Sequence, residues 1–163
     1  AAGAERIFAI DPLENKRELA PTFGATHAVA SLEEAQALVG ELTWGANADK
    51  VLITTGSVDG SMIAPCMSLL AKGGRCVVVS VANINASDAQ LNLFDLTLQR
   101  KELVGCIFGN ANPRRDIPRL LRLYMEGKLK LDELVTTTYG LDEVNQGYQD
   151  MRDGKNIRGL IRY

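Results

Sequence analysis

Short apolar runs alternate with amphipathic segments through the first two thirds of this 163-residue chain. RIFAID, KVLITTG and RCVVVSV are almost continuously apolar, which is typical of strands covered on both faces. Such strands, separated by helices, predict an α/β fold with a parallel, doubly wound sheet and right-handed crossovers. Ligands in these folds bind at the carboxyl ends of the strands. The loops in question begin at Asp11, Thr55, Ser80 and Phe108.

Capping residues and apolar stripes indicate where the helices begin and end. Asp11 suits the N-cap of a first helix, which Gly24 would end. Ser31 with Glu34 three residues on predicts the start of a second helix. A third helix is expected over residues 60–72, stopped by the two glycines that follow it.

The last third follows the same alternation with different lengths. A helix is expected over residues 116–127 and another over residues 141–154, each with an apolar stripe. LVTTTY and IRGLIRY read as the strands that precede and follow the second of these helices. Residues 89–93, AQLNL, alternate apolar and polar side chains and read as a strand at a sheet edge.

Composition excludes several classes of protein. The chain is 46% hydrophobic and 23% charged, which fits a globular protein, and its net charge of −2 gives no electrostatic case for nucleic acid or an anionic membrane. No apolar run approaches the ~20 residues of a membrane span, and no signal peptide is evident, so a cytoplasmic location is expected. Cys66, Cys76, Cys106 and His27 lie far apart and predict neither a disulfide framework nor a zinc site.

Asp11 is the most informative single residue, and it admits two interpretations. In dinucleotide-binding folds an acid at the end of the second strand accepts hydrogen bonds from the adenosine ribose hydroxyls. Alternatively, Asp11 only caps the helix that follows it. The ribose acid ordinarily lies about 20 residues after a Gly-x-Gly-x-x-Gly turn. Ten residues precede Asp11 and the chain has no such turn, so the first interpretation predicts a sheet lacking its first strand and helix.

Longer segments carry a resemblance to a known family. AGAERIFAIDPLENKRELAPTFGATHAVAS, LTWGANADKVLITTG, AKGGRCVVVS and NQGYQDMRDGKNIRGLIRY resemble the C-terminal half of the zinc-type medium-chain alcohol dehydrogenases, particularly the actinobacterial NDMA-dependent branch. The resemblance implies a truncated NAD-binding Rossmann domain over residues 1–112. It implies that residues 113–163 hold the last Rossmann helix and a segment returning to an absent catalytic domain. The zinc ligands, the catalytic residues and the glycine turn would belong to that absent part.

The resemblance also implies a set of cofactor-binding positions, which are Asp11, Lys16, Thr54, Thr55, Gly56, Val79, Val81, Cys106, Phe108 and Arg158. Asp11 and Lys16 would contact the adenosine ribose, with NAD preferred over NADP, and Arg158 would neutralise the pyrophosphate. Residues 54–56 would lie along the adenine and the nicotinamide ribose. The positions after the next two strands would meet the carboxamide, Ile107 would face the substrate, and Ser80 stands where the family often has glycine. Taken singly, each position also fits an ordinary core or surface role.

The reaction implied by the resemblance is hydride transfer between an alcohol or aldehyde and NAD, assisted by zinc in the full-length enzyme. This chain holds no residue expected to be catalytic, so alone it is expected to be inactive. A homodimer or larger oligomer is expected through the sheet edge at residues 89–93. Two alternatives from other classes are a non-enzymatic Rossmann-like interaction module and another nucleotide-binding domain such as a methyltransferase.

Overall fold

The computed structural model describes residues 2–163 and groups them into two compact units. One unit joins the residues up to Ala30 with Asn112–Tyr163, and the other comprises Ser31–Ala111. All paired strands among the described residues are parallel, which confirms the expected α/β class. They form separate sheets in the order β1-β2, β3-β4-β5 and β6-β7.

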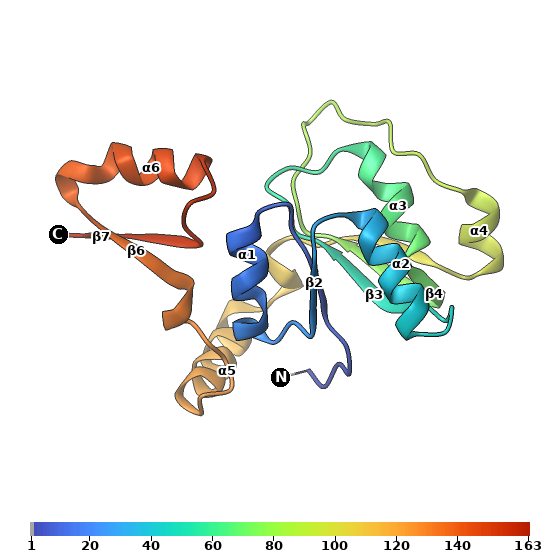
Figure 1. Ribbon diagram of the computed structural model, residues 1–163, viewed down its shortest axis with the longest axis horizontal. Coiled ribbons are helices and arrows are strands. Elements are labelled where there is room, and N and C mark those ends of the chain that lie inside the picture. The colour runs from blue at the N-terminus through green and yellow to red at the C-terminus, as the bar shows by residue number, and fades with distance from the viewer. Residues whose placement is uncertain (1) are drawn as a thin grey trace. The chain divides into compact units, whose positions relative to one another are not determined.

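The unit of residues 31–111 is built on the three-stranded sheet, with α3 packed on β3 and β4 (Figure 1). Its elements are α2 (Leu32–Leu42), β3 (Ala48–Ile53), α3 (Ile63–Ser68), β4 (Leu70–Val78), α4 (Leu93–Leu98) and β5 (Glu102–Gly105). The Ser31 hydroxyl accepts a hydrogen bond from the Glu34 backbone N–H at 3.2 Å, which confirms the predicted start of α2. The core lies between the helices and the sheet and contains Ile53, Ile63, Cys66, Met67, Leu70 and Cys76.

The helix expected over residues 60–72 is wrong in its second half. A 3-10 turn over Gly60–Met62 leads into α3, which ends at Ser68, and β4 begins at Leu70. The backbone N–H of Ala48 donates to the carbonyl of Leu69 at 2.9 Å, so pairing with β3 takes over where the helical pattern would continue. The glycines read as a helix stop form an irregularity inside β4, with Gly73 at a φ of +74°.

The other unit holds the two-stranded sheets. Its elements are β1 (Phe8–Ile10), α1 (Glu14–Leu19), β2 (His27–Val29), α5 (Pro113–Met125), β6 (Val135–Gly140), α6 (Val144–Arg152) and β7 (Arg158–Arg162). The predicted helices and strands of the last third are therefore confirmed, with α5 beginning three residues early. Helix α1 ends at Leu19, earlier than expected, and a 3-10 turn over Ala20–Phe23 continues to Gly24, which has a φ of +99°. Further 3-10 turns of this unit span Asp132–Leu134 and Leu141–Glu143, and Phe108–Asn110 forms one in the other unit.

A small polar network joins β6, α6 and the turn before β7. The buried Asn156 donates from Nδ2 to the Tyr139 hydroxyl at 2.9 Å, and that hydroxyl donates to Asp150 Oδ2 at 2.9 Å. Hydrogen bonds from Gln146 and then from Tyr139 hold the pKa of the Asp150 carboxyl below its ordinary value. Each buried polar atom is thereby satisfied, which is the condition for burying it at low cost.

Residues 89–93 do not form the expected strand within the chain. Residues 89–92 have no strand hydrogen bonds, and Leu93 opens α4. The Asn92 side chain accepts from the Asp95 backbone N–H at 3.0 Å, so the end of the segment serves as a helix cap. An alternating sequence becomes a strand only with a ladder partner, and no described residue supplies one here. No helix over residues 2–163 is long and apolar enough to cross a bilayer.

Candidate functional site

The three parallel strands of the larger sheet bring several predicted site residues to one edge. β3 ends at Ile53, β4 at Val78 and β5 at Gly105, and the loops with the predicted positions follow at once. Backbone hydrogen bonds join these strand ends, from Val79 N to the Ile53 carbonyl at 3.0 Å and from Cys106 N to the Val78 carbonyl at 2.9 Å. The carboxyl-end loops therefore lie side by side at the edge where such folds bind ligands.

The loop after β5 presents two large apolar side chains to solvent. Ile107 is 71% exposed and Phe108 is 89% exposed. Three consecutive residues have left-handed backbone conformations, with φ of +46° at Phe108, +68° at Gly109 and +49° at Asn110. Non-glycine residues adopt this conformation at a cost, and such strain gathers at ligand-binding loops. The exposure of Ile107 and Phe108 leaves both side chains accessible at the edge where the resemblance places them against the substrate and the cofactor.

The Ser80 side chain connects the loop after β3 to the loop after β4. In the sequence, Ser80 is notable only because the family often has glycine at this position. The Ser80 Oγ lies 2.5 Å from the Thr55 carbonyl oxygen and 3.2 Å from the Thr55 hydroxyl. Thr54, Thr55 and Gly56 are exposed at this edge of the sheet. No pattern in the sequence pairs Ser80 with Thr55, because they lie 25 positions apart.

Asp11 lies in the other unit, directly after β1. Its backbone N–H donates to the Val29 carbonyl at 3.1 Å, and its Oδ1 accepts from the Leu13 backbone N–H at 2.9 Å. Helix α1 begins only at Glu14, with Leu13 as its N-cap residue, so the interpretation of Asp11 as the helix cap is wrong. Among the described residues, none donates a hydrogen bond to Asp11 Oδ2. The carboxylate is therefore held by one oxygen and available for a ligand at the other.

Two basic residues of the same unit are also unengaged. Lys16 lies on α1 and is half-buried, and Arg158 opens β7 and is exposed. Neither side chain forms a hydrogen bond or ion pair with any described residue. The Asn15 Nδ2 donates to the Gly154 carbonyl at 3.1 Å, which ties α1 to the turn before β7. Both cations remain free to meet an anionic ligand.

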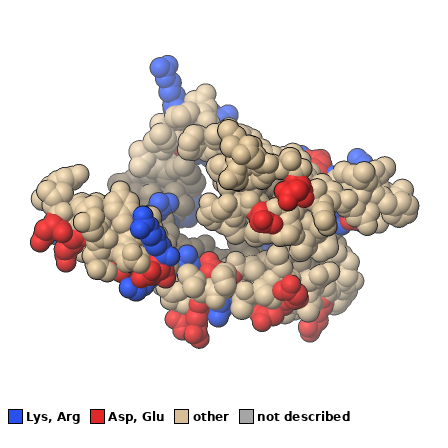
Figure 2. Space-filling model, turned by 90° about the horizontal axis from the view of Figure 1, so that it is seen from above, with Lys and Arg blue, Asp and Glu red and all other residues tan. Residues whose placement is uncertain are grey.

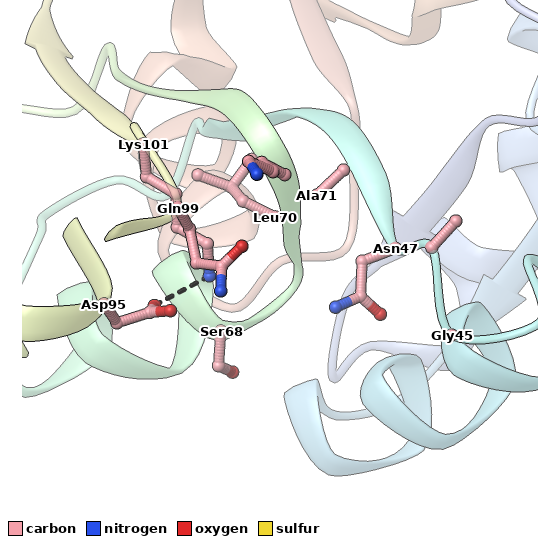
Figure 3. A pocket seen from close by; sticks show the side chains of 10 residues that line it. Gly45, Asn47, Ser68, Leu70, Ala71, Asp95, Gln99 and Lys101 are labelled. Carbon is pink, nitrogen blue, oxygen red and sulfur yellow. Dashed lines mark hydrogen bonds and ion pairs between the residues drawn. The ribbon is translucent and has the colours of Figure 1, made fainter. Parts of the chain in front are cut away.

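A hollow of about 710 Å³ opens at the opposite, amino-terminal end of the larger sheet (Figure 3). Its lining includes Gly45 and Asn47 before β3, Ser68 before β4 and Lys101 before β5. The Lys101 ammonium is buried, lies 2.7 Å from Asp95 Oδ2 and donates to the Met67 carbonyl at 3.0 Å. Its charge is therefore already paired, which makes it a structural residue of the strand starts.

The described residues contain no group of three His, Cys, Asp or Glu side chains that could hold a metal ion. Cys66 and Cys76 are buried in the core. Burial raises the pKa of both thiols, and with the nearby Cys66 it raises the pKa of Cys76 to about 11. At neutral pH both are protonated and poor nucleophiles.

On the face shown in Figure 2, basic and acidic side chains are interspersed, which gives no reason to propose a polyanionic partner.

Comparisons with known proteins agree on one family. Residues 1–126 match the family model described as zinc-binding dehydrogenase. The chain is 51% identical over 162 residues to the NDMA-dependent alcohol dehydrogenase of Amycolatopsis methanolica, covering 99% of this chain and 44% of that protein. It is 47% identical to alcohol dehydrogenase B of Mycobacterium tuberculosis, covering all of this chain and 44% of that protein.

Solved structures support the same assignment. The benzyl alcohol dehydrogenase of Acinetobacter calcoaceticus superposes with a TM-score of 0.88 at 33% identity, over 98% of this chain and 43% of that one. The chain thus spans less than half the length of the relatives it matches. A family model that covers most of the chain, and two relatives near 50% identity, leave one conclusion. The chain belongs to the zinc-binding dehydrogenase family.

Proposed function

We propose that this chain is the NAD-binding portion of a zinc-dependent alcohol dehydrogenase, which transfers a hydride between an alcohol or aldehyde and NAD. One observation carries the proposal beyond family membership. The Asp11 carboxylate follows a parallel strand, is oriented through Oδ1 and keeps Oδ2 free of protein donors among the described residues. This is the arrangement that a vicinal diol of a ribose needs, since both hydroxyls donate and a carboxylate only accepts.

The unengaged charges of the same unit fit the rest of the nucleotide. We assign Lys16 to the adenosine ribose and Arg158 to the pyrophosphate, where a guanidinium offers paired donors to phosphate oxygens. Asp11 would repel the additional phosphate of NADP, so NAD is the proposed cofactor. These assignments rest on the family resemblance and on the absence of competing protein partners among the described residues.

The loops of the larger sheet are proposed to orient the nicotinamide. Thr54, Thr55 and Gly56 would lie along its ribose, and Val79, Val81, Cys106 and Phe108 would meet its carboxamide. Ile107 is proposed to face the substrate. NAD, when bound, accepts or supplies the hydride, and the task of these residues is to hold the ring against the substrate carbon and to exclude water.

Zinc does not fit the described residues, because they provide no set of three ligands. We therefore assign no step of the reaction on this chain to a metal, and we propose that the zinc ligands of the enzyme lie in the part of the relatives that this chain does not cover.

We propose in the same way that residues 1–112 form the truncated NAD-binding domain and residues 113–163 the last helix and the return to the catalytic domain. A cytoplasmic location is also proposed, in keeping with three free cysteines.

The first expected result is that the 163-residue chain binds NAD without oxidising alcohols. NAD binding is measured by calorimetry, with S-adenosylmethionine as the competing nucleoside ligand. Turnover is measured as NADH absorbance with primary alcohols, NAD and added zinc, beside a full-length relative as the positive control. The chain is expected to show no turnover because its described residues offer no set of metal ligands. Turnover by the chain would contradict the proposal, and binding of S-adenosylmethionine instead of NAD would favour a methyltransferase.

The second expected result concerns self-association. We propose a homodimer in which residues 89–93 of two copies pair, since this segment alternates in sequence and has no ladder partner among the described residues. Light scattering is expected to give a dimer mass. The Gln90→Pro variant is expected to give a monomer, because proline removes a ladder donor. Ser87→Pro, at an exposed position outside the segment, is the control and should remain dimeric. A monomeric wild type at high concentration would refute this interface.

A further inference from the structure

We infer that Ser80 is a positioning residue. Its hydroxyl hydrogen-bonds the loop after β3 (residues 54–57) to the end of β4, a contact named here the Ser80 clasp, and so holds the loop in the conformation that binds NAD. The inference rests on the proposed function, and it adds a residue that the family resemblance does not place in the cofactor site. It also predicts that this chain prepares its cofactor loop by a side-chain contact that glycine at the same position could not make.

The contacts converge on one hydroxyl group. The Ser80 Oγ lies 2.5 Å from the Thr55 carbonyl oxygen, 3.2 Å from the Ile53 carbonyl oxygen and 3.2 Å from the Thr55 hydroxyl. Its backbone N–H also donates to the Ile53 carbonyl at 3.3 Å. Ser80 therefore bonds to the strand end of β3 through its backbone and to the exposed loop beyond it through its side chain.

The protons can be assigned from these distances. A serine hydroxyl has one proton, and the Thr55 carbonyl oxygen is its shortest acceptor. The Thr55 hydroxyl lies 2.7 Å from the Ser57 carbonyl oxygen and donates to it. The result is a chain of two hydrogen bonds, one from the Ser80 hydroxyl to the Thr55 carbonyl and one from the Thr55 hydroxyl to the Ser57 carbonyl. These two bonds restrain the start of the loop and its turn.

These hydrogen bonds matter because few other contacts restrain the loop. Residues 54–57 are exposed, and a Cβ atom at Gly56 would have no heavy atom within 4 Å. None of their backbone N–H groups donates to a described residue. Ordering a free loop at the moment of binding costs conformational entropy, and a loop ordered in advance binds its ligand more tightly. Ser80 supplies that order through a contact between two ligand-edge loops.

The test compares three variants of the chain. Ser80→Ala removes the hydroxyl, Ser80→Thr retains one, and Ser68→Ala is the matched control. Ser68→Ala also removes a single hydroxyl-to-carbonyl hydrogen bond, the one from Ser68 to Pro65 at 2.7 Å, but this bond lies at the other end of the sheet. Backbone ¹⁵N order parameters of residues 54–57 report the loop, calorimetric titration with NAD reports binding, and the thermal midpoint reports overall stability.

In Ser80→Ala the order parameters of residues 54–57 are expected to fall from about 0.85 toward 0.6. NAD binding should weaken roughly 3- to 10-fold, the equivalent of one net hydrogen bond. Ser80→Thr should restore both values. Ser68→Ala should change neither, although its thermal midpoint should fall about as much as that of Ser80→Ala.

The outcomes separate this inference from the proposed function. An unchanged loop in Ser80→Ala, in a chain that binds NAD, would overturn the clasp and leave the proposed function intact. A loosened loop with unchanged NAD affinity would show that the clasp is structural only and would overturn the positioning role. A wild-type chain that binds no NAD at all would overturn both.

Discussion

Replacing Leu70 with alanine is expected to lower the free energy of unfolding by about 2–5 kcal/mol, the largest stability effect of any single substitution proposed for this chain. Leu70 is 1% exposed and belongs to the core cluster of the larger sheet. A Cβ atom at Gly74 would lie 3.1 Å from Leu70 Cβ and Cδ2, so the irregular turn of β4 is packed closely against this side chain. Removing three carbons here leaves a cavity that a paired strand cannot collapse into.

Urea unfolding followed by circular dichroism measures this effect. Leu52→Ala is the matched control, because Leu52 lies on β3 of the same sheet and is 62% exposed. Its cost is expected to stay below about 1 kcal/mol. Equal losses for the two variants would mean that the cluster around Leu70 is not the stabilising core of this unit.

The largest effect on function is expected at Asp11. Asp11→Asn should weaken NAD binding about 10- to 100-fold, because hydrogen bonds to a charged group contribute roughly 1.5–3 kcal/mol. The variant keeps an acceptor for the Leu13 backbone N–H, so the turn before α1 should persist. Discrimination against NADP should also shrink, since the repulsion of its additional phosphate is removed. Calorimetric titrations of wild type and variant with NAD and NADP measure both effects.

Asp116→Asn controls for the loss of one carboxylate in the same unit. Asp116 likewise accepts a hydrogen bond from a nearby backbone N–H, that of Asn112 at 2.8 Å, and has no proposed contact with the nucleotide. Its NAD affinity should match that of the wild type. If Asp11→Asn binds NAD as tightly as Asp116→Asn does, Asp11 is not the ribose acid, and the observation that carries the proposed function is lost.

Sequence signals that act over a few residues proved sufficient for most elements. Alternating apolar runs and stripes predicted the strands and helices, and Ser31 with Glu34 marked the start of α2 correctly. Gly24 was predicted to end the first helix, and it instead ends the 3-10 turn after α1, in the left-handed conformation that glycine adopts at little cost. Asp11 could be placed at a strand end from its neighbours alone, since the apolar run that predicts a strand ends at this charge.

Contacts between distant residues decided what remained. Residues 69–72 have a helical pattern, but Leu69 and Leu70 pair with Ala48 at the start of β3, and the chain continues from there as β4. Residues 89–93 have a strand pattern, but without a ladder partner among the described residues they stay irregular and end in a helix cap. Asp11 was decided locally instead: its sequence suited a helix cap, but its carboxylate accepts from the Leu13 backbone N–H, two residues on, before α1 begins at Glu14.

The sequence by itself determined the α/β class, the order of the elements and the positions at the strand ends. Only the tertiary structure decided that Asp11 keeps one oxygen free of the described residues and that Ser80 reaches Thr55. The physical reason is one of range. Periodicity and capping depend on neighbours within one or two turns, whereas a hydrogen bond between two loops depends on how the sheet registers its strands.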